Sequence, residues 1–146
     1  MNLNKIFLMF GYGGDDKGDS KKMKEEFNLY KNTPYFKIGM FHKLITNGNN
    51  FSQQVLKFFL QADPTLDATG IDEAGEYMMY TRAWYWISQC KLRKKEWKEA
   101  LISYTSDEFI VSIKLSIHYF ESIEEYEKCA FLKKIQDFLQ KNLKEA

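Results

Sequence analysis

The chain has 146 residues, of which 45% are hydrophobic and 16% aromatic, with only 2 Pro and 8 Gly. This composition excludes a disordered chain and favours one domain of long regular elements over a turn-rich β fold. The net charge is +1, from 21 Lys and Arg against 20 Asp and Glu, so no global field attracts nucleic acid or a membrane.

The first segment predicted is an N-terminal stretch with a flexible Gly- and Asp-rich loop, over residues 1–19. Its apolar run Ile6–Phe10 is shorter than the ~7–15 residues of a signal-peptide core or the ~18 of a membrane span. We therefore expect a cytoplasmic protein without a membrane partner. The loop Gly11–Ser20 departs from phosphate-binding and calcium-binding patterns. It is interpreted as a surface loop, with a partner-contacting arm as its functional alternative.

A single helical domain is predicted over residues 20–146. Ser20 is expected to cap its first helix, and Pro34 to lie in the first turn of the second. Asn47–Asn50 is a turn by composition, and Asp63-Pro64 ends the helix after it. The helices predicted in this part of the chain are Ser20–Tyr30, Tyr35–Ile45 and Phe51–Ala62.

The stretch Glu76–Tyr104 is predicted to be the centre of the fold. Asp72 is expected to cap its first helix, Tyr77–Leu92, which is apolar nearly all round and so needs neighbours on several sides. The main apolar stripe comprises Tyr77, Met78, Thr81, Trp84, Tyr85, Ser88 and Leu92, and it is widened by Tyr80, Ala83, Ile87 and Cys90.

Two further helices follow Tyr104. Ser106 or Asp107 opens the helix Glu108–Ser122. Ser122 then caps Ile123–Leu143, with Glu125 completing a capping box. The fold class expected is all-α, with about six helices.

The pattern Trp84-x-x-Ile87-Ser88, a turn near Arg93–Lys95, and then Trp97-x-x-Ala100-x-x-x-Tyr104 resembles the tetratricopeptide repeat. The resemblance implies helical hairpins in which Trp84 fills the groove of a partner helix and Tyr104 closes the base. It also implies a protein-binding role.

Three features depart from that repeat. Lys91 stands where an aromatic residue is expected, and Ser112 stands where a proline would end the unit. The spacing from Trp84 to Ile113 is shorter than the family's ~34 residues. A compact bundle of the same hairpins therefore remains the alternative to a stacked repeat.

Residues suited to catalysis or metal binding are few. Cys90 and Cys129 lie on apolar helical faces, which favours two buried, reduced thiols. The only histidines, His42 and His118, do not have zinc-ligand spacing with them. The sequence predicts no catalytic residue, metal or cofactor, and leaves a cryptic Cys–His enzyme as an alternative.

The function expected is that of a non-enzymatic protein–protein interaction module. An arginine next to a cluster of aromatic residues is typical of interface hot spots. The predicted partner-binding residues are Arg82, Tyr85, Trp86, Lys94 and Lys95.

Two other interpretations remain open. The segment Lys91–Lys98 places five positive residues around Trp97, which suits phosphate contacts and base stacking in a nucleic-acid-binding protein. The bias towards Lys, Asn, Ile, Phe and Tyr fits an AT-rich bacterial or phage genome. A small accessory protein that inhibits a macromolecular complex, or a virion component, is therefore also considered. Homo-oligomerisation is left open.

Overall fold

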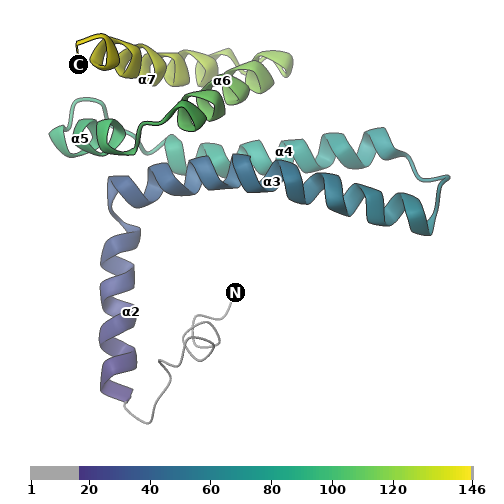
Figure 1. Cartoon of the computed structure of the whole chain (residues 1–146), viewed down its shortest axis with the longest axis horizontal. Helices are drawn as coiled ribbons and strands as arrows, with labels where there is room; N and C mark the ends of the chain where they lie inside the picture. The colour runs from purple at the N-terminus through teal and green to yellow at the C-terminus, as the bar shows by residue number, and fades with distance from the viewer. Residues whose placement is uncertain (1–16, 146) are drawn as a thin grey trace.

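A computed structural model describes residues 17–145, and all regular structure in that range is helical, as predicted. The segment before it, with most of the Gly-rich loop, lies outside the described residues. Six helices follow one another (Figure 1): α2 Lys17–Lys31, α3 Pro34–Ala62, α4 Ala68–Ile87, α5 Lys95–Tyr104, α6 Asp107–Ser122 and α7 Tyr126–Glu145. Between residues 17 and 145, no helix combines the length and apolar character needed to cross a bilayer.

The long helices α3 and α4 form an antiparallel hairpin that organises the molecule (Figure 1). Helices α5, α6 and α7 cover one end of this hairpin, and its other end projects beyond them. Helix α2 leaves the covered end at a steep angle to α3. It is anchored there by Phe36 of α3, whose ring meets those of Phe27 and Tyr30 edge to face.

Several helix boundaries follow the local signals in the sequence. Pro34 occupies the first turn of α3, and the Thr33 hydroxyl caps that helix by accepting from the backbone N–H of Phe36. The helix ends before Asp63, as predicted. Ser106 caps α6 by accepting from the N–H of Phe109 at 3.2 Å.

The predicted turn at Asn47–Asn50 is wrong, because α3 continues through it as one helix of 29 residues. Asn and Gly disfavour helices by roughly 0.7–1 kcal/mol each, but packing against α4 along the whole hairpin outweighs this cost. Gly48 is required by that packing. A Cβ there would lie 2.7 Å from Sδ of Met79, so the glycine marks close approach of side chain and backbone rather than a turn.

Three predicted caps also differ from the structure. Helix α2 begins at Lys17, three residues before Ser20. Asp67, not Asp72, caps α4 by accepting from the N–H of Gly70 at 3.2 Å. Ser122 is the last residue of α6 rather than the cap of α7.

The turn between α6 and α7 is a Schellman-type helix end. The N–H of Glu125 donates to the carbonyl of Phe120 at 2.8 Å, and that of Glu124 to the carbonyl of Glu121 at 3.1 Å. Glu124 takes the left-handed conformation that this motif needs, with φ 62°. The turn therefore reverses the chain and lays α7 back against α6.

The core lies where the first half of α3, the second half of α4, and α5–α7 meet. The predicted main stripe of α4 is wrong in part, since Tyr77, Met78 and Tyr85 are more than half exposed. The residues expected only to widen it are all buried in the core: Tyr80, Ala83, Ile87 and, just beyond the helix, Cys90. Met79, which was predicted in neither set, is buried with them.

Aromatic rings join α4 to the two C-terminal helices. Trp84 is half-buried and meets Phe120 of α6 and Phe131 of α7 edge to face, with centroids 5.9 and 5.2 Å apart. Tyr80 stacks on Tyr119 at 4.3 Å. These pairs are worth about 0.5–1.5 kcal/mol each beyond their buried area, so they hold α6 and α7 on α4.

The two helices that carry the tetratricopeptide-like pattern make their main contacts elsewhere. Trp84 contacts α6 and α7, and Tyr104 of α5 lies against Tyr35 and His42 of α3. Helix α5 packs on α3. The hairpin implied by the resemblance is therefore not the principal contact of either helix.

Two glycines of α3 give a matched test of this packing. Gly39→Ala should raise the free energy of unfolding by about 0.5–1 kcal/mol, because the new Cβ finds its nearest neighbour at 3.6 Å. Gly48→Ala should lower it, because Met79 is buried and overpacking costs about 1–3 kcal/mol. Urea denaturation followed by circular dichroism measures both, and shifts of the same sign would contradict the packing.

Candidate functional site

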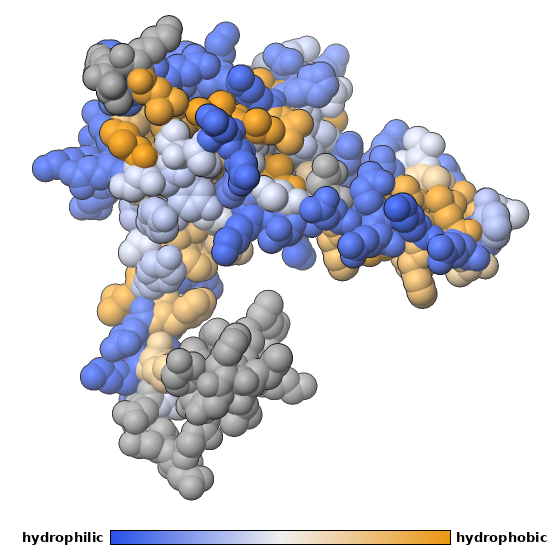
Figure 2. Space-filling model, viewed as in Figure 1, coloured by the Kyte–Doolittle hydropathy of each residue, from blue (hydrophilic) through white to orange (hydrophobic). Residues whose placement is uncertain are grey.

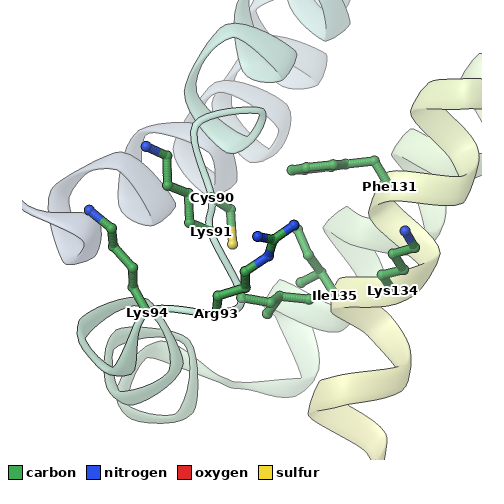
Figure 3. Close-up of a pocket in the computed structure, with 8 residues that line it drawn as sticks. Cys90, Lys91, Arg93, Lys94, Phe131, Lys134 and Ile135 are labelled. Carbon is green, nitrogen blue, oxygen red and sulfur yellow. The ribbon is translucent and has the colours of Figure 1, made fainter.

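The residues that link α4 to α5 form one wall of a recess. The chain leaves α4 at Ile87 and crosses to Lys95 through a short turn rich in Lys and Arg. Helix α7 provides the opposite wall. The recess has a volume of about 680 Å³ (Figure 3), and we call it the basic pocket, lined by Cys90, Lys91, Leu92, Arg93, Lys94, Phe131, Lys134 and Ile135.

The floor of the basic pocket is apolar and uncharged. Ile135 is buried at 1% exposure, and Phe131 projects from α7 over the pocket towards Cys90 (Figure 3). Burial raises the pKa of the Cys90 thiol to about 12, so the thiol is neutral at physiological pH. Such a floor favours an aliphatic or aromatic group.

The rim of the basic pocket carries four cations. Arg93 extends its guanidinium between Cys90 and α7, while the ammonium groups of Lys91 and Lys94 point towards the start of α3 (Figure 3). Lys134 stands on the α7 side. A smaller recess of about 370 Å³ adjoins Lys91 and Lys94 and adds the fifth cation, Lys37, and one carboxylate, Glu96.

None of these five cations makes an ion pair with a carboxylate in the part of the chain that the structure describes. A recess lined by one sign of charge concentrates the field and attracts counter-ions. The arrangement therefore suits a ligand that combines negative charge with an apolar group, since neither feature alone uses both rim and floor.

The residues predicted as partner-binding lie near this end of the molecule but do not form one groove. Lys94 lines both recesses, whereas Lys95 points to solvent and forms an exposed ion pair with Glu99 at 3.7 Å. Trp86 is half-buried against Phe36 and meets the exposed Tyr85 edge to face.

Arg82 lies one turn earlier on α4 and is exposed. The sequence also allows Arg82 an ion pair with Glu76 or Asp72, and no such pair is among the ion pairs of the described residues. Neither Arg82 nor the two aromatic residues after it lines the basic pocket.

Trp97 does not serve as a stacking platform in this fold. Its side chain is only 6% exposed and belongs to the core, as expected of a helix-packing residue. Trp97 lines the smaller recess, but it exposes too little of its ring for the base stacking on which the nucleic-acid interpretation partly rested.

Sequence reasoning missed the α7 wall of the basic pocket. Phe131, Lys134 and Ile135 follow the turn by about forty residues and carry no local signal of a site. Their spacing indicates only a helix with one apolar face. The basic run from Lys91 to Lys95 was the available signal, and only the position of α7 converts it into a pocket.

The catalytic alternatives find little support in the described residues. No group of three or more potential metal ligands occurs there. The thiol of Cys129 donates to the carbonyl of Ile117 at 3.4 Å, and its pKa is raised, chiefly by burial. His118 is exposed on α6. A neutral, buried thiol without a neighbouring base is a poor nucleophile.

A serine–histidine contact occurs elsewhere in the fold. Nδ1 of His42 lies 2.9 Å from Oγ of Ser112, and that hydroxyl donates to the carbonyl of Glu108 at 3.2 Å. Ser112 is 3% exposed, so a substrate has no access to its oxygen. The pair therefore satisfies polar groups between α3 and α6 rather than forming a catalytic site.

Comparison with protein-family models, with curated proteins and with solved structures gives no match for this chain. The resemblance to tetratricopeptide repeats therefore stays a prediction from the sequence, and function must be argued from the site.

His42 should make stability depend on pH. Burial, and to a lesser extent Lys43, lowers its pKa below 6.5, although Glu108 acts in the opposite direction. Above pH 6.5 the imidazole is neutral in both states; below it the unfolded chain binds the proton more readily. Stability should therefore fall from pH 6.5 downwards and level off below the folded-state pKa.

Urea midpoints measured across this range test the effect. His42→Gln should flatten the pH dependence, whereas His118→Gln, on the exposed side of α6, should retain it. An unchanged pH profile in His42→Gln would remove His42 as the cause.

Proposed function

We propose that this protein is a non-enzymatic binding module that docks an acidic segment of a protein partner in the basic pocket. The observation that carries the proposal is the apolar floor of Cys90, Phe131 and Ile135 beneath four unpaired cations, within the described residues. An acidic segment with one large apolar side chain satisfies both parts.

The surroundings of the pocket support a protein partner. Tyr85 is 64% exposed beside Trp86 at the same end of the molecule, so the predicted aromatic residues extend the surface available to a partner. Arginine and aromatic side chains are enriched at the centres of protein interfaces. The role also fits a small accessory protein that inhibits a complex or joins a virion.

Single-stranded nucleic acid is the second candidate ligand. The five cations around the two recesses favour it, because phosphate contacts need such a cluster. Phe131 is the one aromatic residue of the basic pocket available to stack a base, since Trp97 is buried. Proteins that bind single strands without sequence preference stack successive bases on several aromatic side chains. The basic pocket does not combine such side chains.

Binding of a fluorescein-labelled peptide of Asp, Glu and Phe residues tests the proposal by fluorescence anisotropy. Arg93→Glu with Lys134→Glu should weaken binding at least tenfold, because two attractive charges become repulsive. Lys133→Glu is the matched control: it changes the neighbouring, exposed residue outside the pocket and should bind nearly as the wild type does.

The same assay separates the two candidates. Tight binding of an oligothymidine with a steep salt dependence, and no binding of the acidic peptide, would replace the protein partner by nucleic acid. Equal loss in the pocket variant and in the Lys133→Glu control would reject the basic pocket as the site.

A further inference from the structure

The free end of the α3–α4 hairpin has no cover in the described part of the chain. We call residues 50–78 the arm. None of them is buried, and helices α5–α7 lie over the other end of the hairpin (Figure 1). Figure 2 shows apolar surface along this projecting end. Its exposed large apolar side chains are Phe51, Phe58, Phe59, Leu66, Tyr77 and Met78.

The arm is also acidic. It carries five carboxylates and a single cation, Lys57. Two of the carboxylates, Asp63 and Asp67, lie in the loop that joins the helices. Hydrogen bonds from Thr65 lower the pKa of Asp63, so its charge persists at mildly acidic pH.

Leu66 lies in this loop and Phe58 lies near the end of α3, with Phe58 68% exposed. The arm tip, residues 58–67, therefore combines negative charge with exposed apolar side chains. This is the chemistry that the basic pocket requires: an apolar group for its floor and carboxylates for its rim.

The arm tip and the pocket of one chain cannot meet. The tip adjoins the first residue of α4 and the pocket begins just after the last, so a helix of 20 residues holds them about 30 Å apart. The tip of one copy is within reach of the pocket of another. A patch that fits a recess elsewhere on the same molecule makes head-to-tail contacts, which generate rings or filaments.

We infer that the arm tip of one copy docks in the basic pocket of the next, so that the chain assembles head to tail with itself. The inference rests on the proposed function, whose acidic partner segment it identifies as residues 58–67 of a second copy. Phe58 or Leu66 fills the apolar floor, and Asp63 and Asp67 face the cations of the rim.

Light scattering coupled to size-exclusion chromatography tests the assembly with the full chain. The wild type should grow beyond a monomer with concentration at low ionic strength and dissociate at high salt, because the contact is charge-assisted. A wild type that remains monomeric at every concentration and salt would overturn the inference.

Variants that disable one end at a time give the decisive comparison. The pocket variant is Arg93→Glu with Lys134→Glu. The arm variant is Phe58→Ser with Asp63→Asn and Asp67→Asn, in which the asparagines keep the acceptors used by Thr65 and Gly70. Each should be monomeric alone, and their mixture should form a one-to-one dimer, because one intact pocket and one intact tip remain.

Control variants show whether the loss is specific. Phe51→Ser removes an equally exposed ring about two turns before Phe58, and Lys133→Glu reverses a charge beside the pocket, so both should still assemble. Circular dichroism confirms that each variant is folded. Should a combined variant unfold, Phe58→Ser alone and Lys134→Glu alone replace it, each shifting the assembly midpoint to higher concentration.

The outcomes separate this inference from the proposed function. A mixture that stays monomeric overturns head-to-tail assembly, as does self-association of either single-end variant. If the acidic peptide still binds the wild type in that case, the pocket takes a different partner and the proposed function stands. Dimers in the mixture, with assembly lost in each variant alone, establish a second copy as the occupant.

Discussion

The contact of Trp84 with Phe120 and Phe131 is the interaction on which the rest of the structure depends. Two antiparallel helices bury too little surface to be stable alone, so the α3–α4 hairpin needs a further layer. These rings place α6 and α7 on the second half of α4. The ammonium of Lys128 lies over the Trp84 ring, 5.6 Å from its centroid, and adds a cation–π contact from α7.

The same contact creates the basic pocket. Phe131 touches Trp84 on one side and lines the pocket on the other, so the packing that closes the core also fixes the distance between α7 and the turn after α4. Four cations are thereby held together although they repel one another. The group buried beneath these cations is the neutral Cys90 thiol and not a carboxylate, so it does not offset their repulsion. A negatively charged ligand would relieve that repulsion.

Much of the fold was predictable from the sequence, because helical periodicity and the caps at Thr33-Pro34 and Ser106 act locally. The errors arose where tertiary packing decides. Asn and Gly at residues 47–50 predicted a turn, yet close contact with Met79 made the same glycine part of a continuous helix. The mixed apolar faces of α4 did not reveal which side meets α6. The basic pocket is built from two segments that are far apart in the sequence. Only the basic turn after α4 was recognisable as part of a site.

The net charge of this chain does not show how its acidic and basic residues are distributed over the structure. A value of +1 was taken to exclude a strong field, but the charges are separated along α4. Carboxylates outnumber cations five to one on the arm, whereas five cations and one carboxylate line the recesses at the other end. Because α4 is a continuous helix, the molecule cannot fold back to neutralise these ends against each other. The two ends can be paired with each other only between molecules, as in the head-to-tail assembly that we infer.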